Sequence, residues 1–118
     1  MEKIKDFTDL IVWQKSHQLV LKIYKITKDY PSEEKFGLVG QMRRAAVSIP
    51  ANVAEGFKKR SLKDKANYYN IAQGSLNETK YYLILSKDLG CMKSNTELLS
   101  DVDGIHKMLY GLIESLSS

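Results

Sequence analysis

The sequence predicts a single all-α domain over residues 1–118, folded as an antiparallel up-down-up-down four-helix bundle. Apolar residues in four long segments recur every three or four positions, which is the helical period, and strand signals are weak. The chain has only two prolines, and no Ser/Gly-rich linker divides it. The connections between the segments are short, which favours antiparallel packing of consecutive helices.

The first helix is expected from about Thr8 to Asp29. It ends at Tyr30–Pro31, because the residue before a proline is pushed out of the α region. Its apolar face is broader than one packing seam needs and includes Leu10, Trp13, Leu19, Val20, Ile23, Tyr24 and Ile26. Such surplus apolar surface favours contact between subunits. We interpret Phe7, Trp13 and Phe36 as core or interface anchors. We interpret His17, on the same face, as a buried histidine with a partner.

The second helix is expected from about Leu38 to Phe57, after a short connector over residues 32–37. Pro50 lies inside it, and an interior proline costs about 3 kcal/mol. The apolar register is nevertheless kept on both sides of the proline, by Leu38, Met42, Ala45, Ile49 and Val53. We therefore predict a kinked but continuous helix that ends near Gly56.

The third and fourth helices have clear boundary signals. Ser61 is a favourable N-cap for the third helix, which is expected to continue to Leu89 before Gly90 closes it. Gly74 in its middle costs up to about 1 kcal/mol and indicates the close approach of another backbone. The fourth helix follows Ser94–Glu97, which has the spacing of a capping box. Its heptad seam consists of Leu98, Val102, Ile105, Leu109, Leu112 and Leu116.

The net charge of +4 is unevenly distributed. Residues 1–93 carry 17 basic and 10 acidic side chains, whereas residues 94–118 carry one basic and four acidic side chains. This asymmetry permits a polyanionic partner on one surface, although solvated helix faces produce the same pattern. No apolar run approaches the roughly 20 residues of a membrane span. The charged residues 1–6 do not resemble a signal peptide, so we expect a cytoplasmic protein without a membrane partner.

The residues that usually carry catalysis or bind metals are sparse. Cys91, His17 and His106 lack the spacing of a metal site. Ser48 has no histidine on its own helix that could activate it as a nucleophile, and no Gly-rich phosphate loop is present. We therefore expect no enzyme activity, no metal and no cofactor.

A polar stripe on the second helix borders its apolar face. It consists of Gln41, Arg44, Ser48, Asn52 and Glu55, which fall within an arc of about 80°. Polar groups at the border of a core need partners, so we interpret the stripe as a structural network or an interface. A ligand-binding stripe is the alternative. Arg44 is expected to pair with a carboxylate on another helix, such as Glu78, or on another subunit.

A basic turn precedes the third helix. It consists of Lys58, Lys59, Arg60, Lys63 and Lys65, which together with Asp64 give a charge of +4 over eight residues. Tyr68 and Tyr69 follow it. Basic side chains contact phosphates and aromatic rings stack on bases, so this segment is a candidate for binding RNA or DNA. The alternative is that the lysines are solvated and the tyrosines belong to the core.

The segment Gln41–Gly56 closely resembles the signature of a bacterial family of four-helix-bundle proteins. Members are often encoded in intervening sequences of large-subunit ribosomal RNA genes, and some are labelled ribosomal proteins. The accessory variability determinant of diversity-generating retroelements is related to them. The resemblance continues in Val12–Lys15, Tyr30–Pro31 and Ile71–Leu76, and covers about residues 7–90. This chain departs from the pattern at Ser16, usually alanine, and at Lys80, usually acidic.

The resemblance implies a ring-shaped homo-pentamer that associates with nucleic acid, and in the retroelement branch also with a reverse transcriptase. Combined with the basic turn, it predicts a non-enzymatic homo-oligomeric protein that binds RNA or DNA through a basic rim. One alternative is a protein–protein scaffold with no nucleic-acid role, and another is a small-molecule or enzymatic function in a central channel. Salt-sensitive binding to generic RNA distinguishes the predicted nucleic-acid-binding protein from the scaffold.

Overall fold

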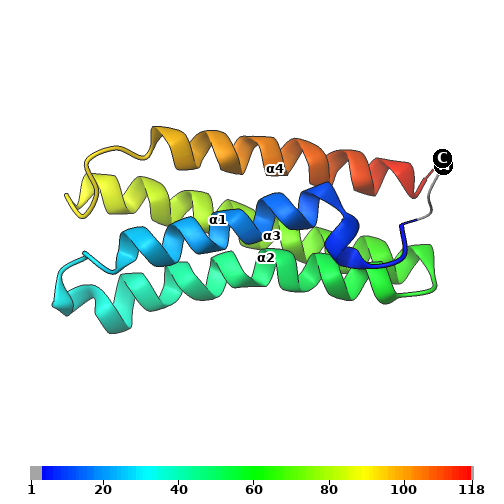
Figure 1. Ribbon diagram of the computed structural model, residues 1–118, viewed down its shortest axis with the longest axis horizontal. Coiled ribbons are helices and arrows are strands. Elements are labelled where there is room, and N and C mark those ends of the chain that lie inside the picture. The colour runs from blue at the N-terminus through cyan, green and yellow to red at the C-terminus, as the bar shows by residue number, and fades with distance from the viewer. Residues whose placement is uncertain (1–3, 118) are drawn as a thin grey trace.

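The computed structural model describes residues 4–117 and contains four antiparallel helices (Figure 1). They are α1 (Ile11–Thr27), α2 (Gly40–Lys58), α3 (Leu62–Asp88) and α4 (Thr96–Ser115). Residues 4–117 contain no strand, which confirms the all-α class. Residues 1–3 and Ser118 lie outside the described residues. Residues 1–3 belong to the charged segment 1–6, from which the sequence argues against a signal peptide.

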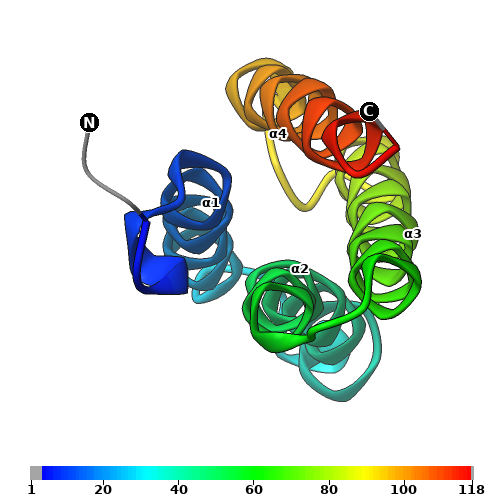
Figure 2. The same ribbon diagram turned by 90° about the vertical axis from the view of Figure 1, so that its right-hand side faces the viewer.

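The four helices stand at the corners of an elongated bundle, in the order α1, α2, α3, α4 (Figure 2). The bundle measures 46 × 24 × 20 Å. All four helices contribute to one core, whose largest fully buried side chains include Leu19, Ile23, Met42, Ile49, Leu76, Leu83, Ile105 and Leu109. Each such side chain contributes about 1.5–3 kcal/mol through burial. The seam of α4 is buried from Leu98 to Leu109 and becomes partly exposed at Leu112 and Leu116.

Helix α1 begins three residues later than predicted, at Ile11. Asp6 caps a separate 3₁₀ turn, Phe7–Asp9, and Leu10 is extended, which separates that turn from the helix. The buried face of α1 also differs from the prediction, because it includes Ser16 and Thr27. Their hydroxyls donate to carbonyls within the same helix, so neither is left unsatisfied in the core. Tyr24 and His17, which the sequence placed on the core face, are exposed.

Helix α2 is continuous through the buried Pro50, which confirms the predicted continuity. Its apolar register is kept, since Met42, Ala45, Ile49 and Val53 are all buried. A 3₁₀ turn, Ser32–Glu34, and one π-helical turn, Lys35–Val39, connect α1 to α2. The second helix therefore begins at Gly40 rather than Leu38, because the preceding backbone adopts the wider π turn.

The ends of α3 agree with the prediction. The Ser61 hydroxyl accepts a hydrogen bond from the Asp64 backbone N–H at 3.1 Å, and Gly90 closes the helix with a φ of +80°. The capping box predicted for α4 is wrong. The N-cap is Asn95, whose side chain makes no cap hydrogen bond and instead donates to the Leu83 carbonyl at 3.2 Å. This bond ties the α3–α4 connection to the core.

The predicted close approach at Gly74 is also not found within the chain. Nothing lies within 4 Å of the position that a Cβ would occupy there. The close contact is instead at Gly56, where a Cβ would lie 2.5 Å from Cε1 of Tyr69. Gly56 therefore allows the end of α2 to pack against the start of α3.

Candidate functional site

The basic turn lies at one end of the bundle, where α2 passes into α3 (Figure 1, green). Helix α2 stops because Lys59 has an extended backbone, and Ser61 starts the next helix two residues later. The turn between them is short, so Lys58, Arg60 and Lys63 all point to solvent.

The five cations of the basic turn have different roles. The side chains of Lys58, Arg60 and Lys63 make no hydrogen bond or ion pair with any of residues 4–117. Lys65 instead donates to the carbonyls of Gly56, at 3.3 Å, and Phe57, at 2.8 Å. These carbonyls lie in the last turn of α2, where cations compensate the helix dipole. Lys65 is therefore structural.

Lys59 is also engaged, because its Nζ lies 3.8 Å from an Oε2 of Glu55 and 5.0 Å from the centre of the Tyr68 ring. The N-terminal segment lies close to the turn as well. Hydrogen bonds from the hydroxyl and backbone N–H of Thr8 lower the pKa of Asp6, and the charge of Lys58 adds a smaller contribution in the same direction. The side chains of Lys58, Arg60 and Lys63 thus form no ion pair within residues 4–117, and of these three the charge of Lys58 acts on Asp6.

The aromatic residues near the turn are mostly not available for stacking. Tyr69 is only 2% exposed and packs on Gly56, and this burial raises its pKa. Tyr69 therefore belongs to the core, as the alternative interpretation proposed. Trp13 is half-buried, with Phe7 edge-on at 5.2 Å and His17 stacked on it at 5.1 Å. The prediction that His17 is buried is wrong, because the Trp13 ring holds it on the surface of α1.

Phe36 is 89% exposed and belongs to the π turn Lys35–Val39, in the connection between α1 and α2 at the opposite end of the bundle (Figure 1, cyan). It is not a core anchor, because the π turn that carries it directs Leu38 and Val39 inward instead. Its role as an interface anchor stays a prediction.

The centre of the polar stripe forms a network between α2 and α3. The hydroxyls of Ser48 and Ser75 lie 2.7 Å apart. The Asn52 amide donates both to the Ser48 carbonyl, at 2.8 Å, and to the Ser48 hydroxyl, at 2.9 Å. These side chains are half-buried and satisfy one another, so this part of the stripe fixes the register of the two helices.

The ends of the stripe are exposed at Gln41, Arg44 and Glu55. Arg44 forms no ion pair within residues 4–117, so the predicted pair with Glu78 is absent from the chain. The Glu78 carboxylate instead accepts a hydrogen bond from the Tyr82 hydroxyl at 3.4 Å. Burial and then Glu78 raise the pKa of Tyr82, while the charge of Arg44 opposes this shift. An ion pair of Arg44 with another subunit stays a prediction.

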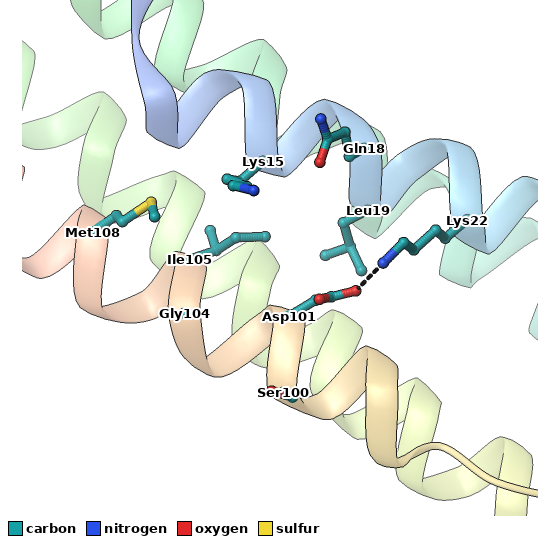
Figure 3. Close-up of a pocket in the computed structure, with 9 residues that line it drawn as sticks. All are labelled: Lys15, Gln18, Leu19, Lys22, Ser100, Asp101, Gly104, Ile105 and Met108. Carbon is teal, nitrogen blue, oxygen red and sulfur yellow. Dashed lines mark hydrogen bonds and ion pairs between the residues drawn. The ribbon is translucent and has the colours of Figure 1, made fainter.

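A groove of about 240 Å³ between α1 and α4 was not predicted from the sequence (Figure 3). Lys22 of α1 reaches across it to the carboxylates of Asp101, at 2.8 Å, and Glu97, at 3.1 Å. These hydrogen bonds raise the pKa of Lys22. Leu19 and Ile105 also line the groove. Asp101, the one acidic residue among its lining residues, is already paired with Lys22. The sequence signal that could have indicated this contact is the excess of basic side chains on α1 and of acidic side chains on α4.

No group of three or more potential metal ligands is found in residues 4–117. Cys91 is half-buried, and burial, followed by the charges of Glu34 and Glu33, raises the pKa of its thiol. A neutral thiol is a poor nucleophile. Within residues 4–117, no helix is both long and apolar enough to cross a membrane.

Comparisons with known proteins identify a family and a solved structure with a similar fold. Residues 8–111 match the family model described as 23S rRNA-intervening sequence protein. A crystal structure from Bacteroides thetaiotaomicron, described as a protein of unknown function from the S23 ribosomal protein family, superposes with a TM-score of 0.78. It is 29% identical, and the match covers 87% of this chain and 98% of that chain. No curated protein sequence matches this chain significantly.

Proposed function

The chain belongs to the 23S rRNA-intervening sequence protein family, and from this premise we propose that it is a non-enzymatic homo-oligomer that binds RNA or DNA. The observation that carries the proposal is the exposure of Lys58, Arg60 and Lys63 on one turn, where their side chains form no ion pair with any of residues 4–117. Cations that are not engaged within the protein are free to neutralise phosphates.

In a ring of like-facing subunits, the basic turn would repeat around one rim. A polyanion that touches several copies gains avidity without any new kind of contact. We propose a pentamer because the resemblance implies one, and the cytoplasmic location expected from the sequence remains part of the proposal. If the gene belongs to a retroelement, a reverse transcriptase would be a further partner.

The basic turn would contact the phosphate backbone rather than base edges. Binding should then be weakly selective for sequence, since phosphate contacts position a protein but carry no base information. It should also weaken with salt, with a slope of about −0.7 per phosphate contact for single strands.

The test is a salt titration of binding to a labelled RNA and a labelled DNA. The variant Lys58→Glu/Arg60→Glu/Lys63→Glu should abolish binding and keep the fold, because exposed turn residues contribute little stability. Lys59 and Lys65 stay unchanged, because they bond other parts of the chain.

The matched control, Lys80→Glu/Lys87→Glu/Lys93→Glu, changes the net charge equally at exposed positions outside the turn. It should retain most of the binding, whereas equal loss in both variants would show that only net charge matters. If the triple variant of the turn binds as tightly as the wild type, the turn is a solvated loop.

A protein–protein scaffold is the second candidate function. It is favoured by large apolar side chains exposed on the helices, among them Leu21, Ile71, Tyr81 and Ile84. Absence of RNA and DNA binding at low salt would favour this function. Light scattering tests the shared expectation of assembly, and a monomer mass at micromolar concentration would contradict it.

A further inference from the structure

A second basic site lies at the end of the bundle opposite the basic turn, where α1 is connected to α2 (Figure 1, cyan). It is a pocket of about 260 Å³. Its lining residues are Thr27, Lys28, Tyr30, Pro31, Ser32, Lys35, Val39 and Arg43. Three of them are cations and none is a carboxylate.

Arg43 is held firmly in this pocket. Its Nε donates to the Thr27 hydroxyl at 3.0 Å, and its Nη2 donates to the Tyr24 carbonyl at 3.2 Å. The Tyr24 ring lies 4.4 Å from the guanidinium carbon. Thr27 is itself buried and donates to the Ile23 carbonyl, so it is fixed as well. A guanidinium has five N–H donors, and these two bonds leave three of them for a ligand.

The side chains of Lys28 and Lys35 are exposed and form no hydrogen bond or ion pair with residues 4–117. Lys35 has only a ring contact, 5.7 Å from the centre of Phe36. The acidic residues nearby in sequence do not line the pocket. Asp29 is exposed. Burial raises the pKa of the Cys91 thiol, and the negative charges of Glu34 and Glu33 raise it further.

Compensation of the α1 dipole explains only part of this cluster. The bond from Arg43 to the Tyr24 carbonyl satisfies a group near the C-terminus of α1, where cations are favourable. The ammonium groups of Lys28 and Lys35 bond no carbonyl of residues 4–117, so compensation of the helix dipole does not account for these side chains at the same pocket.

We propose that this pocket binds a phosphate monoester. Such a group carries about −1.5 to −2 charge at pH 7, which balances three cations better than a diester would. The remaining donors of Arg43 can bind two phosphate oxygens, and arginine–phosphate pairs of this kind are strong because both partners are charged. The Ser32 hydroxyl lines the same pocket and supplies another donor. This site does not depend on the function proposed for the basic turn.

The phosphate monoester can belong to a small molecule or to the 5′ end of a nucleic acid. The test is a titration of the isotope-labelled protein, followed by amide NMR, with inorganic phosphate, uridine 5′-monophosphate and uridine. Phosphate and the nucleotide should shift the amide signals of Thr27, Ser32 and Arg43, and uridine should not.

The variant Lys28→Gln/Lys35→Gln should weaken binding of the nucleotide by about tenfold or more, because each lysine forms a charge-assisted contact. Both lysines are exposed, so the fold should be unaffected. Arg43→Gln is less suitable by itself, because Arg43 also bonds α1. The control Lys87→Gln/Lys93→Gln removes the same charge and should bind the nucleotide like the wild type.

A 5′-phosphorylated and a 5′-hydroxyl oligonucleotide then distinguish the two sources. A preference for the phosphorylated strand that the double variant loses assigns the site to nucleic-acid ends, and nucleotide binding without such a preference assigns it to small molecules. The proposal is overturned if phosphate and nucleotide shift only the signals of Lys58–Lys65 or none, or if the double variant binds the nucleotide like the wild type.

Discussion

Gly56 and Gly74 are both helical glycines, but the structure gives them opposite surroundings. A Cβ on Gly56 would lie 2.5 Å from Cε1 and 2.8 Å from Cδ1 of Tyr69, and 3.2 Å from Cβ of Tyr68. A Cβ on Gly74 would have no neighbour within 4 Å. The same substitution to alanine should therefore change stability in opposite directions at the two positions.

The magnitude for Gly56→Ala follows from two opposing terms. Alanine gains up to about 1 kcal/mol in helix propensity over glycine. Carbon atoms pack best at about 3.5–4.0 Å, so the new methyl would overlap Tyr69 by about 1 Å. Overpacking costs about 1–3 kcal/mol, and the upper part of that range applies because Tyr69 is only 2% exposed. The net expectation is a loss of about 1–2 kcal/mol.

Gly74→Ala is the matched control, because it adds the same methyl group without the overlap. It should stabilise the protein by about 0.5–1 kcal/mol through helix propensity alone. With a shift of about 4 °C per kcal/mol for a domain of this size, Tm should fall by about 4–8 °C for Gly56→Ala and rise by about 2–4 °C for Gly74→Ala.

The assay is thermal and urea unfolding followed by circular dichroism, with all proteins at one concentration, because assembly would make Tm concentration-dependent. Equal stabilisation by both substitutions would refute the close contact between Gly56 and Tyr69. Destabilisation by Gly74→Ala would refute its open environment and restore the close approach that the sequence suggested, with the approaching backbone then supplied by another subunit.

Three further predictions concern buried polar groups. The Tyr30 hydroxyl is buried without a hydrogen-bond partner among residues 4–117; Tyr30→Phe should leave the free energy of unfolding unchanged or raise it by up to about 1 kcal/mol in urea denaturation. Ser48→Ala removes the partner of the Ser75 hydroxyl and should lower the free energy of unfolding by about 1 kcal/mol, and a neutral result would contradict the structural role of the stripe. Burial raises the pKa of Tyr69 above its ordinary value of 10.0, so its contribution to stability is complete below pH 10 and is lost as pH rises through the higher folded pKa. Tyr69→Phe should then lose less free energy of unfolding than the wild type between pH 9 and about 11, and parallel losses would contradict the assignment.

The elements of the fold were predictable because their signals are local. Ser61 and Gly90 act on backbone groups within a few residues, so the boundaries of α3 follow from the sequence alone. The continuity of α2 across Pro50 followed from its apolar register. The capping signal at Ser94–Glu97 failed because the helix begins one residue later than the signal requires. The Ser94 hydroxyl accepts from the Thr96 backbone N–H at 3.3 Å, and the N-cap Asn95 bonds the carbonyl of Leu83 on α3 instead.

Which side chains lie inside was decided only by how the helices approach one another. Ser16 and Thr27 are buried because hydroxyls bonded within their own helix take little space and leave no unsatisfied group. Hydrophobic spacing favoured His17 and Tyr24 instead, but the neighbouring helices do not cover them.

The sequence by itself determined the fold class, the family resemblance and the cluster of positive charge at residues 58–65. It gave five equivalent cations, and only the tertiary structure separated Lys65, which caps α2, from the free Lys58, Arg60 and Lys63. Sequence reasoning did not find the proposed phosphate pocket, because Lys28, Lys35 and Arg43 lie on three different elements: the end of α1, the π turn and α2. These three side chains line one pocket because the connection between α1 and α2 reverses the direction of the chain and brings the end of α1 beside the start of α2.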